Sequence, residues 1–313
     1  MLMHLLFLAI GLPLLFYGGD FLVSGSIRIS RQLNISPFII GATVIGFGTS
    51  APELAVSILA ALAGAPELAM GNVIGSNIAN VGLVLGLTSL LIPLTISRDR
   101  LRQEAPALVF ATFLIAVLAW DLKLNRFEAV AMVVLLAAYL WRAFNKKEEP
   151  LGEVFEEEEI RWLSGKGLAA QWVLVILGLS MLVMGAKLLV DSGVGITRAL
   201  GVSEWLIGIS IIAVGTSLPE IVSSLMAAKR GQGEIAIGNV FGSNIFNILM
   251  VLGIAGTVHP LHIREPIHPD LLFTTGLTCL LLVLICLENC LKRRDGIILL
   301  TCYLSYMVLK SML

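Results

Sequence analysis

The sequence predicts an all-α polytopic membrane protein with ten transmembrane helices arranged as two inverted five-helix repeats. Three observations predict this fold: an apolar composition, ten apolar segments of membrane length, and a repeat at a constant offset of 167 residues. Of the 313 residues, 57% are hydrophobic and 14% are charged, with a mean hydropathy of +0.93. A soluble domain is closer to about half apolar and a quarter charged. The net charge of −1 gives no indication of a nucleic-acid partner.

Ten segments are long and apolar enough to cross a bilayer, which takes about 20 mostly apolar residues. They lie near 3–25, 37–62, 71–93, 104–121, 125–143, 169–191, 204–228, 237–258, 271–288 and 296–312. The long hydrophilic stretch is 144–168, whose run of glutamates is typical of a solvated linker. The sequence therefore predicts a first five-helix unit at 1–143, an acidic linker at 144–168 and a second five-helix unit at 169–313.

The distribution of lysine and arginine predicts the orientation in the membrane. Of the 21 basic residues, 15 fall in loops that follow odd-numbered segments, five lie on the opposite side, and Lys187 lies within a segment. Loops rich in these residues remain cytoplasmic. We therefore expect the acidic linker in the cytoplasm and both termini outside it, in a multi-pass protein of the inner (plasma) membrane.

The two halves repeat without a gap over long stretches. The segment GNVIGSNIAN at 71–80 falls on GNVFGSNIFN at 238–247, and Glu53 falls on Glu220. Because five is an odd number of spans, the second copy must enter the membrane upside down. Inverted repeats are typical of transporters, whose sites lie near the midplane on interrupted helices.

The motif GTSAPE, which ends at Glu53, places polar groups inside the second apolar segment. Thr49 and Ser50 precede Glu53 by four and three residues, so on a helix the three side chains share one face. Pro52 has no N–H, and the carbonyl of Gly48 therefore loses its helical partner. Such freed backbone is tolerated at membrane depth only when it is buried or lines a wet cavity. These oxygen atoms are of the kind that Ca²⁺ prefers, and Na⁺ has a similar radius.

The motif recurs as GTSLPE, with Thr216, Ser217 and Glu220 at the equivalent positions. Two carboxylates that face each other in a low dielectric repel unless a cation lies between them or one is protonated. A single intramembrane glutamate could be a protonated structural residue. Two of them in the same context on opposite repeats indicate a cation site instead.

Polar stripes follow each motif in the next apolar segment. They are formed by Asn72, Ser76 and Asn80 in the first half and by Asn239, Ser243 and Asn247 in the second. The i, i+4, i+8 spacing places each stripe on one helix face. Their oxygens could complete a coordination shell, or the stripes could serve only to bond neighbouring helices together.

These motifs resemble the alpha repeats of the calcium/cation antiporter superfamily, most closely those of the prokaryotic sodium/calcium exchanger family. The resemblance rests on both GTS-x-PE motifs, each followed by GN-x-x-GSN, and covers essentially the whole chain. It implies a central site enclosed by spans two, three, seven and eight, with no cofactor beyond the transported calcium and sodium ions. It also implies that spans one and six slide past the others to switch access between the two sides.

The resemblance also implies a ligand set, position by position. The implied calcium ligands are Glu53, Glu220, Thr49 and Thr216. The implied sodium ligands are the side chains of Ser50, Ser217, Ser76 and Ser243 and the backbone carbonyls of Gly46 and Ala213. Asn80 and Asn247 complete the set at the centre. Some relatives carry an aspartate where Asn247 stands, and that carboxylate is tied to potassium use, so the asparagine argues against potassium cotransport.

The sequence therefore predicts a secondary antiporter, not an enzyme, that exchanges calcium for sodium by alternating access. Its expected partners are the two ions and the lipid bilayer, and neither a nucleic-acid nor a protein partner is inferred. The alternative on the same scaffold is an antiporter of calcium, or another divalent cation, for protons, although that branch typically carries a GN-x-x-E motif. A cation channel is disfavoured by the inverted repeat, and an intramembrane hydrolase by the absence of a histidine near the glutamates.

Overall fold

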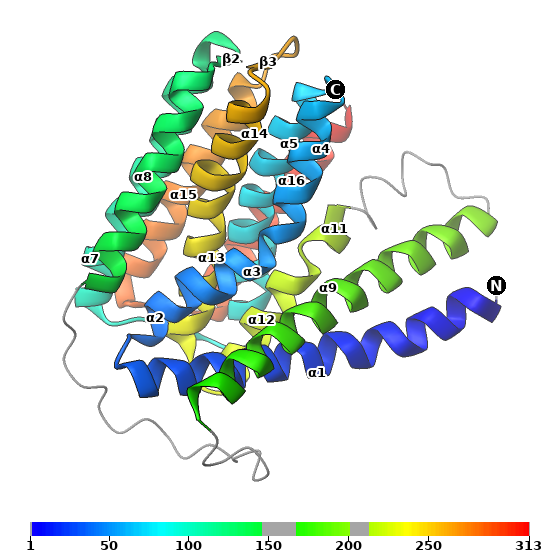
Figure 1. Cartoon of the computed structure of the whole chain (residues 1–313), viewed down its shortest axis with the longest axis vertical. Helices are drawn as coiled ribbons and strands as arrows, with labels where there is room; N and C mark the ends of the chain where they lie inside the picture. The colour runs from blue at the N-terminus through cyan, green and yellow to red at the C-terminus, as the bar shows by residue number, and fades with distance from the viewer. Residues whose placement is uncertain (1, 146–166, 201–212, 313) are drawn as a thin grey trace.

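The computed structural model describes residues 2–145, 167–200 and 213–312, and this part of the chain is mostly helical (Figure 1). The elements of the first half are α1 (Leu2–Leu33), α2 (Pro37–Ile40), η1 (Gly41–Ile45), α3 (Gly46–Thr49), α4 (Ala51–Leu62), α5 (Pro66–Ala79), η2 (Asn80–Leu85), α6 (Gly86–Leu91), β1 (Leu94–Thr95), α7 (Arg98–Leu118), η3 (Ala119–Asp121), β2 (Lys123–Leu124) and α8 (Arg126–Asn145). Those of the second half are α9 (Leu168–Ala199), α11 (Ala213–Thr216), α12 (Leu218–Lys229), α13 (Gly233–Phe246), η5 (Asn247–Leu252), α14 (Gly253–Val258), β3 (Leu261–His262), α15 (His268–Glu288), β4 (Cys290–Leu291) and α16 (Arg293–Met312).

Eight of the described helices are long and apolar enough to cross a membrane, and a ninth span results if the bent pair Pro37–Thr49 and Ala51–Leu62 is counted as one. Ten spans were expected from the sequence. The remaining one, predicted at 204–228, lies partly outside the described residues, which contain only its α11 and α12 portions. The acidic linker predicted at 144–168 lies almost wholly outside them.

The prediction of an all-α fold is wrong in one detail, because two short antiparallel ribbons join the helical hairpins. β1 pairs with β4, with Leu94 opposite Leu291, and β2 pairs with β3, with Lys123 opposite His262. The offset of 167 residues converts one ribbon into the other. Backbone groups between two helices need partners, and these two-residue strands supply them. Strands this short leave no periodic pattern in a sequence.

Polar bonds at the helix ends also come in pairs that differ by 167 residues. Glu67, in the first turn of α5, accepts a bond of 3.2 Å from the backbone N–H of Arg264. Its equivalent Glu234, in the first turn of α13, accepts one of 2.9 Å from the N–H of Ser97. A carboxylate at a helix N-terminus is further stabilised by the helix dipole.

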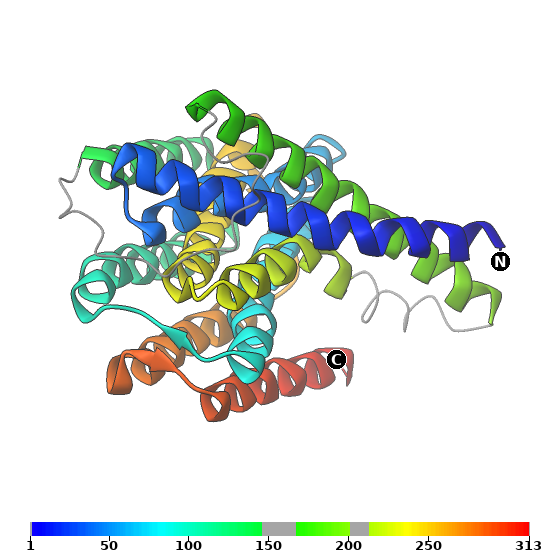
Figure 2. The ribbon, with the colours of Figure 1, turned by 90° about the horizontal axis from the view of Figure 1, so that it is seen from below.

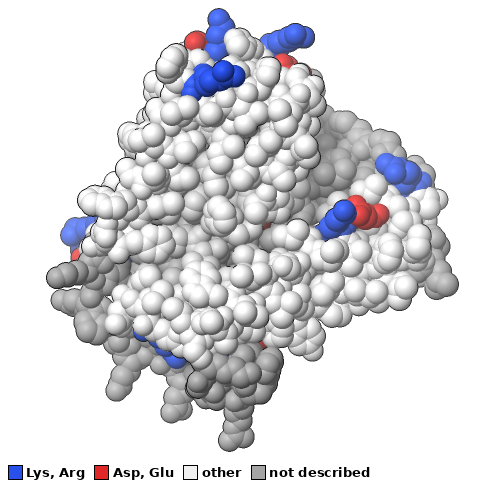
Figure 3. Space-filling model, in the orientation of Figure 1, with Lys and Arg blue, Asp and Glu red and all other residues white. Residues whose placement is uncertain are grey.

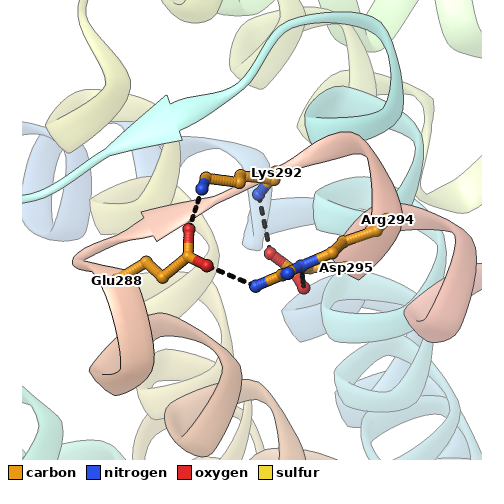
Figure 4. A network of polar contacts seen from close by, with 4 residues as sticks. All are labelled: Glu288, Lys292, Arg294 and Asp295. Atoms are coloured by element: carbon orange, nitrogen blue, oxygen red, sulfur yellow. Dashed lines mark hydrogen bonds and ion pairs between the residues drawn. The ribbon is translucent and has the colours of Figure 1, made fainter.

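A charged network surrounds the turn between α15 and α16 (Figure 4). Asp295 accepts a bond of 2.8 Å from the backbone N–H of Lys292, which caps the start of α16. Glu288 pairs with Arg294 at 2.5 Å and with the Lys292 ammonium. Exposed pairs contribute little to stability, so we interpret the network as a helix cap rather than a binding site.

The segment formed by α13, η5 and α14 lies at the centre of the molecule. Its most apolar stretch of 18 residues is 100% buried, whereas the corresponding stretch of α1 is 33% buried. Helices α1 and α9 lie side by side and project from the rest of the bundle in both views (Figure 1, Figure 2). Charged side chains gather at the two ends of the face shown in Figure 3, apart from a few over α9, and the surface between is uncharged. This is the pattern of a membrane protein.

The two halves differ where α5 and α13 meet their neighbours. A Cβ built on Gly242 of α13 would collide with the backbone of Ala42 in η1, whereas one built on the equivalent Gly75 of α5 meets no atom within 4 Å. Helix α13 is therefore packed directly onto backbone, and the same face of α5 borders open space.

Gly242→Ala is expected to destabilise the protein, and Gly75→Ala to be tolerated. The methyl group at position 242 would meet backbone that cannot rotate away, and overpacking of this kind costs about 1–3 kcal/mol. Thermal unfolding in detergent measures the difference, because each kcal/mol lowers Tm by about 2–4 °C in a chain of this size class. Equal Tm values for the two variants would contradict the packing.

Candidate functional site

Each GTS-x-PE motif interrupts a helix at its serine. Helix α3 ends at Thr49, Ser50 adopts φ −83° and ψ 0°, and α4 begins one residue later, bent by 44°. In the second motif Ser217 has φ −90° and ψ 4° between α11 and α12. The proline in the first turn of the following helix lacks an N–H, which is the physical cause of each interruption.

The helices that carry the polar stripes are also irregular at the same level. The π-helical segments η2 and η5 begin at Asn80 and Asn247, which are equivalent residues. A wider turn of this kind leaves backbone and side chains out of the regular ladder, and it is frequent at functional sites. The site is thus bounded by two broken helices and two helices with a π-helical turn.

Buried oxygen atoms without a hydrogen-bond partner are concentrated at the two helix breaks and the two π-helical turns. Of the 15 buried polar side-chain atoms that lack a partner in the described residues, seven are oxygens of this site. They are the Oγ atoms of Ser50 and Ser217, Oε2 of Glu53, both carboxylate oxygens of Glu220, and the Oδ1 atoms of Asn80 and Asn247. Because an unsatisfied buried oxygen is costly, a cation bound among these atoms would be stabilised.

The two glutamates, which the repeat is expected to bring together, are both buried. Glu53 is 2% exposed and Glu220 is 1% exposed. Burial leaves little water to screen the two carboxylates, and the charge of Glu53 acts on Glu220. The Thr49 hydroxyl approaches the Glu220 carboxylate, although the two do not meet hydrogen-bond geometry.

Thr49 lies on a closed side of the site. Its side chain is buried and its Oγ1 lies 3.2 Å from Oγ of Ser243 and 3.5 Å from Oδ1 of Asn239. The Ser243 hydroxyl also donates a bond of 3.4 Å to the carbonyl of Gly46, a carbonyl that accepts the Ser50 N–H at 3.1 Å. On this side, the oxygens of Thr49, Ser243 and the Gly46 carbonyl, which belong to the predicted set, are therefore joined by hydrogen bonds.

The equivalent side at Thr216 is open. Thr216 is exposed, and with Ser217 and Ser76 it lines a pocket of about 320 Å³. The far wall of this pocket is α16, which contributes Tyr303, Tyr306, Met307 and Lys310. Ala213, whose carbonyl is in the predicted set, is the first described residue of α11. Two nearly identical motifs therefore have opposite accessibility in this structure.

Asn77 and Asn244 join the two stripe helices, and sequence analysis missed them. Each donates its Nδ2 to the backbone carbonyl of the other at 3.4 Å. Oδ1 of Asn244 accepts a bond of 3.0 Å from Asn80, and Oδ1 of Asn77 accepts one of 3.1 Å from Asn247. These bonds use the amide groups of Asn80 and Asn247, so their oxygens remain available to the site. The signal was present, since Asn77 and Asn244 are the N of the two GSN triplets.

The outer members of the stripes act as interhelical bonds. Asn72 donates to Oγ of Ser57 at 2.9 Å and to the backbone carbonyl of Glu53 at 3.2 Å. Asn239 donates to the hydroxyls of Ser223 and Ser224, both at 3.0 Å. The interhelical-bond interpretation of the stripes therefore holds for Asn72 and Asn239. The described residues contain no group of three or more His, Cys, Asp or Glu that could hold a metal ion, so a cation here would depend on two carboxylates and neutral oxygens.

Comparison with known proteins gives a consistent result over the whole chain. A family profile described as sodium/calcium exchanger protein matches residues 3–145 and 170–312. The sodium/calcium exchanger MaX1 of Methanosarcina acetivorans is 34% identical over 97% of each chain. The putative antiporter CaxA of Alkalimonas amylolytica is 39% identical over 83% of this chain and 82% of its own length. A solved structure of the sodium-calcium exchanger NCX_Mj superposes with a TM-score of 0.85 at 34% identity and covers 98% of each chain. The chain therefore belongs to the sodium/calcium exchanger family and is a membrane-embedded cation antiporter rather than an enzyme.

Proposed function

We propose that the protein exchanges calcium for sodium through one central site that contains Glu53 and Glu220. The observation that supports this proposal most strongly is the cluster of seven buried oxygens without partners, which includes carboxylate oxygens from both halves. Calcium prefers oxygen ligands and needs negative charge, which the three carboxylate oxygens of this cluster supply, while the other four are neutral oxygens that suit sodium. The relatives MaX1 and NCX_Mj, both sodium/calcium exchangers, agree with this proposal.

The ligands divide between the two ions as follows. Calcium would be held by the carboxylates of Glu53 and Glu220 with the hydroxyls of Thr49 and Thr216. Sodium would use the hydroxyls of Ser50, Ser217, Ser76 and Ser243 and the carbonyls of Gly46 and Ala213, with Oδ1 of Asn80 and Asn247 at the centre. The arrangement is symmetric in composition, and each half supplies one member of every pair.

Coupling follows from charge balance. The charge of the two buried carboxylates is balanced by one calcium ion or by more than one sodium ion, but not by both sets of ions at once. A site left empty keeps two like charges in a low dielectric, which is costly. The site therefore changes sides when it is filled, and the two ions compete for it.

Access alternates because the halves are two inverted five-helix repeats, 1–143 and 169–313, with ten spans in all. Paired features at an offset of 167 residues support the repeat: the two ribbons, the bonds of Glu67 and Glu234, and the reciprocal asparagines. The open pocket lies on the Thr216 side. With both termini outside and the linker at 144–168 in the cytoplasm, as the basic residues predict, this is the outward-facing state.

Flux of calcium-45 in proteoliposomes tests the proposal. Sodium loaded inside is expected to drive calcium uptake, and equal potassium or proton gradients are not. Calcium uptake that follows a proton gradient and is indifferent to sodium would refute sodium coupling in favour of the proton antiporter. Flux that does not depend on any counter-ion would indicate a channel.

A further inference from the structure

Two basic residues at the end of α12 fasten this helix to α1. Arg230, which follows Lys229 as the cap of α12, places Nη2 2.5 Å from Oδ1 of Asp20. The two side chains are 19% and 25% exposed, so the ion pair is largely shielded from water. One turn earlier on α1, the ring of Phe16 lies 5.7 Å from the ammonium of Lys229. An ion pair and a cation–π contact thus act on the same face of α1.

The repeat does not reproduce this fastening in the other half. One repeat away, Asp20 corresponds to Lys187 and Arg230 corresponds to Ala63, so no opposite charges face each other there. Lys187 lies in α9, and Ala63 is the cap that follows α4; both helices are fully described. α1 packs along α12, and no comparable packing joins α9 to α4. The contact therefore belongs to one side of the molecule and to the present conformation.

Helix α9 packs differently from its equivalent α1, because it contacts both GTS-x-PE motifs. Gly48 of the first motif packs against Leu179 of α9, and Gly215 of the second motif packs against Val190 of the same helix. Suppose that the two halves exchange conformations when access changes sides. Relative to α12, α1 then takes the position that α9 now has relative to α4, the equivalent of α12. It then leaves α12, and the carboxylate of Asp20 separates from the guanidinium of Arg230.

We propose that the Asp20–Arg230 ion pair, supported by Lys229 over Phe16, is a latch that holds the site open on the Thr216 side. The inference rests on the proposed alternating-access function. An interaction present in one state and broken in the other biases the equilibrium between them by its own free energy. The latch therefore sets the resting orientation of the site, and each transport cycle has to break and remake it.

Single cysteines report which side of the site is open. Met307→Cys lies in the wall of the open pocket, and Leu140→Cys is its equivalent in the other half. Each is made in a protein whose four free native cysteines are replaced by alanine; these are Cys279, Cys286, Cys290 and Cys302. With Asp20→Asn, a charged thiol reagent applied to solubilised protein is expected to modify Met307→Cys about fivefold more slowly and Leu140→Cys faster. Unchanged rates at both positions would overturn the latch.

Matched variants separate pairing from general damage. Lys187→Gln removes a charge at the equivalent position of α9 and is expected to leave both rates unchanged. The exchanged pair Asp20→Arg with Arg230→Asp is expected to restore the native rates, and a double variant as altered as the single one would contradict pairing. Lys229→Met, which leaves the ion pair intact, is expected to shift the rates in the same direction by less.

Labelling does not require ion transport, so the two proposals fail separately. A native chain that labels as expected but shows no sodium-driven calcium flux would refute the proposed function alone. A chain that exchanges the ions but labels identically with and without Asp20 would refute the latch alone.

Discussion

Glu220→Gln is expected to reduce sodium-driven calcium exchange by more than about 100-fold while the protein remains folded. The amide keeps the shape of the side chain and one oxygen, but it removes one of the two charges that balance a divalent cation. Loss of one partner from a buried charge pair costs about 3–5 kcal/mol, and 1.4 kcal/mol is a factor of ten in affinity. Glu53→Gln is expected to behave in the same way, because the repeat gives it the same position.

Calcium-45 flux in proteoliposomes measures this loss, with size-exclusion profiles as the check on folding. The matched control is Glu128→Gln, a carboxylate that caps α8 by accepting a bond of 2.8 Å from the backbone N–H of Asn125. A glutamine oxygen can accept the same bond, so exchange should be unchanged. Native flux in either Glu53→Gln or Glu220→Gln would refute the assignment of the two carboxylates.

Asn244→Leu is expected to lower stability and transport together. The change removes the acceptor for the Asn80 amide, which is left unpaired, and one of the bonds to the Asn77 carbonyl, which still accepts the backbone N–H of Asn80. An unpaired buried group costs about 1–3 kcal/mol, so Tm should fall by about 2–12 °C. Transport should fall as well, because Asn80 loses the bond that directs its oxygen toward the site.

Thermal unfolding in detergent and calcium flux test both parts. Asn77→Leu is the equivalent change and should match Asn244→Leu in both measurements, since their bonds are reciprocal. Asn125→Leu, at the exposed start of α8, is the control and should leave flux unchanged. A large loss in only one of Asn77→Leu and Asn244→Leu would contradict the reciprocal arrangement.

The interruption of the helix at each motif could be predicted from the sequence because its cause is local. Pro52 removes a backbone donor, and the break appears at Ser50, where the lost bond requires it. The buried position of Glu53 and Glu220 could also be anticipated, since both lie in long apolar segments. The two π-helical turns had no such local signal, because Asn80 and Asn247 are compatible with an ordinary helix.

The difference between the two sides of the site could not be predicted. Thr49 and Thr216 occur in nearly identical motifs, yet one is buried against Ser243 and the other is exposed in a pocket. Sequence repeats describe what the halves share, whereas the difference between them is a property of the conformation. The role of Asn77 and Asn244 was hidden for a related reason: their bonds are to backbone of the other half, and spacing within one helix cannot show them.

The most direct test of the central claim is equilibrium binding of calcium-45 to the purified protein as sodium is increased. If calcium and sodium share one site built on Glu53 and Glu220, bound calcium should fall to background as sodium rises, and neither Glu53→Gln nor Glu220→Gln should bind calcium measurably at the same concentration. Calcium binding that persists at saturating sodium, or that survives in both variants, would contradict the account.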